Sequence, residues 1–289
     1  MPLPPLDRYT AERYRLRTMS KPFLNNDLMQ GPARFRGYDF KNPRLRRCVF
    51  DPDSVVFESR IGGGDDGFVW KVRFGDEGPF VLKIFWDQVP PRESGAYYPM
   101  QRECQNAAVI QMLEASVTSE PVLVYQRPLG KQDAASNYAA FWEENRPSKV
   151  VWKIDRANPP PGTEFMSSTP RMTKCYGWLK LRSDLWTELP ADLQPSHEDA
   201  SKVKKLVTGY TGPIGVVYEL VQDGENEPCV VEEVDNFLWQ TGFAYTVEPR
   251  ARSWKSGILI DHAEIVHTRG YGWSEDDYMN RTAEQIVKK

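Results

Sequence analysis

The chain has 289 residues, of which 40 % are hydrophobic and 27 % charged, with a formal net charge of −3. These values are typical of a soluble globular protein with one large domain or two lobes, and the length is enough to bury a sizeable core. No apolar run approaches the roughly 18 residues of a membrane span, and the first residues contain no signal-peptide core. The four cysteines form no Cys-x-x-Cys pair, so we expect no metal site, no disulfide framework and a reducing, cytoplasmic location.

The charge is unevenly distributed along the chain. Residues 1–50 contain eleven Lys and Arg against four Asp and Glu, a net charge of +7, so the rest of the chain carries about −10. We interpret this segment as a basic arm with short helical pieces, suited to a polyanionic partner. The alternative is a solvated arm that wraps its own acidic body.

Short apolar runs joined by Gly and Asp turns follow the arm and predict an antiparallel meander. Strands are expected at 54–59, 68–74 and 79–86. A helix is expected over 98–117, because Ala107, Ile110 and their apolar neighbours recur at helical spacing.

The second half of the chain is expected to alternate strands and helices. Further strands are expected at 174–181, 214–221 and 257–260, and helical segments at 185–208 and 230–243. We therefore divide the chain into the arm (1–50), a first lobe (51–225) with an insertion (118–170), and a reduced second lobe (226–289).

A glycine-rich segment lies between the first two predicted strands. It fits the pattern G-x-G-x-x-G-x-V and contains Gly62, Gly64, Asp65, Asp66 and Gly67. A strand on each side is typical of a phosphate-covering hairpin, whereas a dinucleotide-binding turn opens a helix. Glycines there allow backbone N–H groups to approach a ligand closely. The alternative is an ordinary glycine-rich turn.

Two later residues strengthen this interpretation. Lys83 lies in an apolar strand 16 residues after Gly67, and Glu103 follows 20 residues later on the predicted helix. In protein kinases such a lysine and glutamate form an ion pair that orients the lysine on the phosphates. The alternative for Lys83 is a solvated strand residue.

At this point the chain resembles the protein-kinase-like superfamily, and more closely the fungal family labelled by the kinetochore Sim-four-complex subunit domain. The resemblance rests on the runs IGGGDDGFVWKVRF, FVLKIFWD, KCYGWLKL and WKSGILIDHAEIV. It implies an α+β, protein-kinase-like fold, with an antiparallel five-stranded N-lobe sheet, helix C and a reduced C-lobe.

The sequence departs from kinases where catalysis is performed. After the helix at 230–243 neither the catalytic Asp nor the metal-binding Asn is present, and the loop carries Glu248. Asp261 and His262 stand where a kinase has its metal-binding Asp-Phe-Gly. Phosphoryl transfer needs a positioned nucleophile and metal-held phosphates, so we exclude a working protein kinase. The alternative role of Asp261 is a strand-end cap.

The two carboxylates of the glycine segment disfavour binding of a triphosphate and favour binding of a cation such as a guanidinium. The alternative is that both are turn residues that face water. The chain is also similar overall to fungal arginine-containing cyclodipeptide synthases. That similarity implies that the arm binds arginyl-tRNA and that no cofactor is needed. It also implies that Lys83 polarises the ester carbonyl and that Glu103 holds Lys83 in place. Asp261, Glu248 or His262 would accept the proton. The alternative function is an inactive pseudokinase that binds a protein partner in a nuclear assembly.

Overall fold

The structure is a computed structural model that describes residues 22–64, 66–90, 97–149, 155, 158–194 and 212–287. Two compact units make up the chain. Unit 1 comprises residues 1–29, 46–104 and 175–220, and unit 2 comprises residues 30–45, 105–174 and 221–289. Their relative position is not determined, so each is described by itself.

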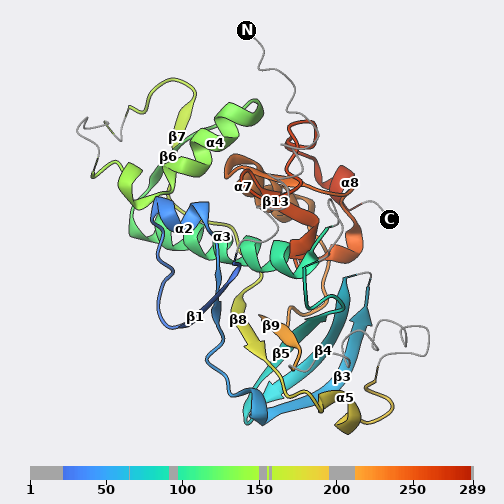
Figure 1. Cartoon of the computed structure of the whole chain (residues 1–289). Helices are drawn as coiled ribbons and strands as arrows, with labels where there is room; N and C mark the ends of the chain where they lie inside the picture. The colour runs from blue at the N-terminus through green and yellow to red at the C-terminus, as the bar shows by residue number, and fades with distance from the viewer. Residues whose placement is uncertain are drawn as a thin grey trace, which may run out of the picture. The chain divides into compact units, whose positions relative to one another are not determined.

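Unit 1 is built on a seven-stranded sheet (Figure 1). Its spatial order is β1-β2-β8-β9-β5-β4-β3. The strands are β1 (Leu24–Leu28), β2 (Leu45–Arg47), β3 (Val55–Gly63), β4 (Gly67–Phe74), β5 (Glu77–Phe85), β8 (Cys175–Lys180) and β9 (Ile214–Glu219). A 3-10 turn, η1 (Pro52–Ser54), leads into β3, and the short helix α5 (Leu185–Glu188) follows β8.

The expected five-stranded antiparallel sheet is wrong, although the α+β class is confirmed. Strands β8, β9, β5, β4 and β3 are antiparallel to one another in that order, but β2 pairs parallel with β8 through Arg47 and Trp178, so the sheet is mixed. Two strands were missed within residues 22–50. They are short and lack strong apolar alternation, so only their pairing with the sheet identifies them.

The expected kinase lobe with helix C and a reduced C-lobe is also wrong. A helix does follow β5, as α3 (Pro99–Ser119), but its residues up to Cys104 belong to unit 1 and the remainder to unit 2. Unit 2 is not a reduced appendage of the chain's end, because it draws on three separate segments.

The core of unit 1 covers one face of the sheet. Side chains alternate across a strand, so every second residue of β4 and β5 enters this core. It contains Phe68, Trp70, Val72, Phe80, Leu82, Ile84 and Val217, with Leu181, Leu185, Leu189 and Leu193 packed against them. Because these residues are almost fully buried, they supply most of the hydrophobic stabilisation of this unit.

Unit 2 packs helices against short hairpins. Its helices are α2 (Gly37–Lys41), the later part of α3, α4 (Gly130–Ala140), α7 (Pro228–Gln240) and α8 (Ala283–Ile286). Its hairpins are β6 (Val122–Tyr125) with β7 (Thr163–Met166), β10 (Phe243–Tyr245) with β13 (Ile265–His267), and β11 (Trp254–Lys255) with β12 (Ile258–Leu259). The 3-10 turns are η2 (Glu143–Asn145), η4 (Ala251–Ser253) and η5 (His262–Glu264).

Helix α7 illustrates why these segments fold as they do. Pro228 stands in the first turn, where its missing N–H costs nothing, and Gly242 follows the helix with a φ of +88°. Val231, Val234 and Leu238 recur at helical spacing and enter the core of unit 2. The helix expected at 230–243 is therefore confirmed.

The other expected elements also have counterparts. Strands expected at 54–59, 68–74, 79–86, 174–181, 214–221 and 257–260 correspond to β3, β4, β5, β8, β9 and β12. Of the helix expected at 185–208, only α5 lies in the described residues, and residues 9–19 lie outside them. None of the helices in the described part of the chain has the length and hydropathy needed to cross a bilayer.

Candidate functional site

The candidate site lies on the face of the unit 1 sheet opposite its apolar core. Lys83 pairs with Val69 of β4 and Val216 of β9, so these residues share a face. Lys83 alternates with Leu82 and Ile84, which point into the core. The strand pattern therefore directs the ammonium group away from the apolar core.

Lys83 and Glu103 form the ion pair expected from the sequence. Lys83 Nζ lies 2.5 Å from Glu103 Oε2, with the glutamate side chain 0 % exposed and the lysine side chain 12 % exposed. A buried carboxylate is strongly unfavourable unless hydrogen bonds and an opposite charge compensate it. The pair holds the ammonium group in place, and a small part of the lysine side chain remains exposed.

Tyr218 completes the coordination of this carboxylate. Its hydroxyl donates a hydrogen bond of 2.9 Å to Glu103 Oε1. Burial, and next the neighbouring Glu103 charge, raise the pKa of Tyr218 well above its ordinary value. The phenol therefore stays protonated and remains a donor at working pH. Sequence reasoning missed Tyr218, because its approach to Glu103 depends on the pairing of β9 with β5.

The glycine hairpin joins β3 to β4 and is tied to the end of β5. Gly64 N donates a hydrogen bond of 2.9 Å to Gly67 O within the hairpin. Trp86 donates two more hydrogen bonds, from its indole Nε1 to Gly64 O and from its backbone N to Asp66 O. A Cβ at Gly67 would lie 2.4 Å from the carbonyl oxygen of Ile84, so close strand approach requires glycine there. A Cβ at Gly62 or Gly64 would meet no described atom within 4 Å.

Asp66 contacts a tyrosine that the sequence reasoning also missed. Tyr97 OH donates a hydrogen bond of 3.2 Å to Asp66 Oδ2. The guanidinium carbon of Arg102 lies 4.1 Å from the centre of the Tyr97 ring. Burial, and next the Asp66 charge, raise the pKa of Tyr97. Asp65, the other predicted carboxylate, lies outside the described residues.

Glu248, Asp261 and His262, the other expected catalytic residues, lie in unit 2. Glu248 is exposed in the loop after β10. Asp261 Oδ1 accepts a hydrogen bond of 3.1 Å from Ala263 N and caps the 3-10 turn η5. His262 is only 1 % exposed. Lys83 and Glu103 belong to unit 1, so the structure groups these three residues separately from the ion pair.

Unit 2 contains a second group of buried polar side chains. Asp235 Oδ2 accepts a hydrogen bond of 2.7 Å from Arg281 N, and the Arg281 guanidinium lies 4.8 Å from the Tyr245 ring centre. Burial raises the pKa of Asp235 to about 6, against the hydrogen bond from Arg281. Ser253 Oγ donates to Glu264 Oε1 at 2.7 Å, and burial also raises the pKa of Glu264.

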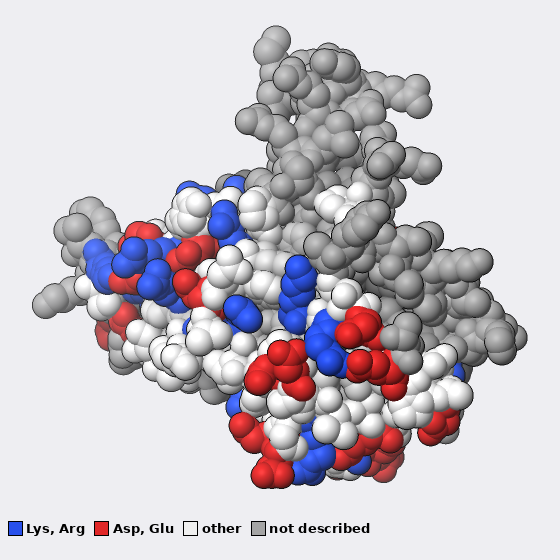
Figure 2. All heavy atoms as spheres, turned by 60° about the horizontal axis from the view of Figure 1, so that its bottom comes forward, with Lys and Arg blue, Asp and Glu red and all other residues white. Residues whose placement is uncertain are grey.

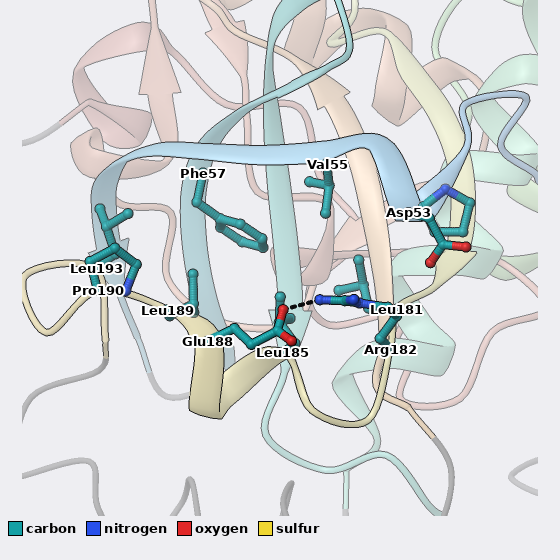
Figure 3. Close-up of a pocket in the computed structure, with 11 residues that line it drawn as sticks. Asp53, Val55, Phe57, Leu181, Arg182, Leu185, Glu188, Leu189, Pro190 and Leu193 are labelled. Atoms are coloured by element: carbon teal, nitrogen blue, oxygen red, sulfur yellow. Dashed lines mark hydrogen bonds and ion pairs between the residues drawn. The ribbon is translucent and has the colours of Figure 1, made fainter.

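A cavity of about 190 Å³ lies on the core side of the unit 1 sheet (Figure 3). Val55 and Phe57 line it from β3, and leucines of the segment after β8 line it from the other side. Arg182 and Glu188 form an ion pair among its lining residues. Its lining is mainly apolar and it lies across the sheet from Lys83, so we do not include it in the candidate site.

The basic arm is only partly described. Of its eleven basic residues, six lie in the described part, at positions 34, 36, 41, 44, 46 and 47. Arg36 Nε lies 3.6 Å from Glu143 Oε2, and Lys41 Nζ lies 4.7 Å from the centre of the Trp142 ring. Both contacts lie within unit 2, to which residues 30–45 belong. Figure 2 shows both signs of charge interspersed on the face drawn.

No protein-family model matches the chain, and no curated protein matches its sequence significantly. Within the described residues, no group of three His, Cys, Asp or Glu side chains is arranged to hold a metal ion. The functional interpretation therefore rests on the geometry around Lys83.

Proposed function

We propose that the chain is an aminoacyl-tRNA-dependent transferase that joins arginine and a second amino acid into a cyclic dipeptide. One observation carries the proposal. A lysine side chain that is 12 % exposed has its ammonium fixed by a fully buried carboxylate, in the same unit as a glycine hairpin that carries Asp66. A fixed positive charge and a carboxylate within one unit suit a substrate with an uncharged carbonyl and a cationic side chain better than a triphosphate.

Lys83 provides what ester aminolysis requires. The amine of one aminoacyl group attacks the ester carbonyl of the other and forms a tetrahedral oxyanion, which a preorganised ammonium stabilises. Collapse forms the amide, breaks the ester bond and releases the tRNA ribose hydroxyl, to which the proton lost by the amine is transferred. Attack by the second amine on the remaining ester closes the ring and releases the second tRNA in the same way.

The acidic hairpin supports the choice of arginine. A carboxylate accepts two parallel hydrogen bonds from a guanidinium, whereas it repels the phosphates of a nucleotide. Asp66 is the described candidate for this contact, and Tyr97 orients its carboxylate through the hydrogen bond to Oδ2. The +7 charge of residues 1–50 supports the tRNA partner through contacts with the phosphate backbone.

The test uses the full-length protein with arginine, a second amino acid, tRNA, ATP and the matching synthetases, with cyclic dipeptides detected by mass spectrometry. Arginine-containing product that disappears after ribonuclease treatment supports the proposal. Product that forms without tRNA contradicts it. No product with any second amino acid also contradicts it, and favours the alternative of a non-catalytic binding module.

A matched pair of lysine variants assigns the chemistry. Lys83→Met is expected to lower the rate of product formation about 10²- to 10³-fold, because the oxyanion loses its preorganised charge. Lys71→Met removes a lysine from the neighbouring strand β4, where Nζ pairs with Glu58 Oε2 at 2.9 Å on a more exposed surface. The Lys71 variant is expected to keep the wild-type rate. Equal rates in the two variants exclude Lys83 from catalysis.

A further inference from the structure

Glu103 accepts a hydrogen bond at each of its two carboxylate oxygens, from Lys83 and from Tyr218. We propose that Tyr218 is a positioning residue, which acts through Glu103 to hold the Lys83 ammonium where the reaction needs it. This inference rests on the proposed function of the Lys83 site. It adds Tyr218 to that site, although no sequence pattern connects strand β9 with the lysine.

The three side chains reach one point from three elements. Lys83 lies on β5, Glu103 lies near the start of α3, and Tyr218 lies on β9. Lys83 pairs with Val216 and Val81 pairs with Tyr218, so the register places Lys83 and Tyr218 on the same face of the sheet, two positions apart. The pairing of β9 with β5 therefore fixes the phenol beside the carboxylate.

Tyr218 restricts the carboxylate in a way that Lys83 alone cannot. Glu103 is fully buried, so solvent cannot replace a missing donor at Oε1. Without the hydroxyl, Oε1 loses a hydrogen bond and the carboxylate is free to rotate away from the orientation in which Oε2 meets Lys83 Nζ. Such a rotation releases the Lys83 ammonium. The tyrosine thus sets the orientation of Glu103, and Glu103 sets the position of Lys83.

The decisive experiment measures Lys83 directly and needs no product formation. The full-length protein is treated with an amine-acylating reagent, and modification of Lys83 is followed by peptide mass spectrometry as a function of time and pH. Tyr218→Phe removes only the hydroxyl, and acylation of Lys83 is expected to become about tenfold faster at a given pH. The acylation rate of Lys71 in the same samples is expected to remain unchanged.

Two controls separate positioning from general loosening of the fold. Tyr176→Phe removes a phenol hydroxyl from β8, where the Tyr176 ring packs against Phe80, and is expected to leave Lys83 acylation unchanged. In a Glu103→Gln background, Tyr218→Phe is expected to add no further change, because the residue through which it acts has lost its charge. An unchanged Lys83 rate in folded Tyr218→Phe, or equal acceleration by Tyr176→Phe, overturns the inference.

Kinetics link the result to the reaction while keeping the two proposals separable. In the cyclic-dipeptide assay, Tyr218→Phe is expected to lower kcat about tenfold and leave KM for aminoacyl-tRNA nearly unchanged. Accelerated acylation without any cyclic-dipeptide activity supports the positioning role and contradicts only the proposed function. Should Tyr218→Phe fail to fold, 3-fluorotyrosine at residue 218 keeps the phenol and changes the strength of its hydrogen bond to Glu103. The rate of Lys83 acylation is then expected to change, and an unchanged rate overturns the inference.

Discussion

Two buried carboxylates, Glu103 and Asp235, show how the surroundings of an acidic residue determine its chemistry. Glu103 faces an ammonium and a tyrosine hydroxyl, whereas Asp235 receives a backbone N–H and lies beside Tyr245. Burial dominates at Asp235 and raises its pKa to about 6. Glu103 therefore suits a role as a fixed counter-charge, and Asp235 makes unit 2 sensitive to pH.

The raised pKa of Asp235 predicts lower stability at neutral pH than at acidic pH. The folded-state pKa of about 6 exceeds the ordinary value of 3.8, so the folded state holds the proton more strongly than the unfolded state. This contribution to stability is complete below pH 3.8 and is lost as the pH rises to about 6.

Asp235→Asn keeps an acceptor for Arg281 N but removes the charge. Urea unfolding is expected to give a variant about 1–3 kcal/mol more stable than the wild type at pH 7.5, with little difference near pH 4. A variant whose advantage is the same at both pH values contradicts a titrating Asp235.

At the scale of elements, the glycine hairpin shows that its glycines have different roles. Gly67 stands where β4 approaches β5 most closely, whereas Gly64 faces open space among the described atoms. From the sequence motif alone, Gly64 and Gly67 are both expected to let the backbone approach a ligand. The structure instead assigns a packing requirement to Gly67 and leaves Gly62 and Gly64 available for approach by a ligand.

Matched alanine substitutions test this division. Gly67→Ala places a Cβ against the Ile84 carbonyl and is expected to destabilise the protein by about 1–3 kcal/mol. Gly64→Ala is expected to change stability by less than about 0.5 kcal/mol. Thermal unfolding of both variants measures the difference, and equal effects would show that the close strand approach does not constrain residue 67.

At the scale of the whole molecule, the four cysteines differ in burial, with three in unit 1 and one in unit 2. Cys48, Cys104 and Cys175 are buried, and Cys229 at the start of α7 is exposed. Burial raises the pKa of all three buried thiols, to about 11 for Cys48, so their reactive thiolate form is scarce near neutral pH.

A thiol-reactive chromogenic reagent at pH 8 is therefore expected to modify one cysteine rapidly in the native protein and all four in denaturant. Cys229→Ser is expected to abolish the rapid phase. A second rapidly reacting thiol in the native protein contradicts the burial of the other three.

The sequence alone determined the local features of this protein. Alternating apolar residues between Gly-rich turns identified β3, β4 and β5, and helical spacing identified α3 and α7, because each pattern is set by neighbouring residues. The Lys83–Glu103 pair was also predicted, because the spacing between the strand lysine and the helical glutamate is the one that protein kinases use for such an ion pair.

Only the tertiary structure decided which distant segments pair. The parallel contact of β2 with β8 and the approach of Tyr218 to Glu103 join residues more than a hundred positions apart, and β1 enters the sheet only through β2. Such contacts depend on strand register, and a shift of one residue would turn Tyr218 to the opposite face. Local patterns carry no information on that register, so the sequence predicted the charged pair and left the residue that positions it unidentified.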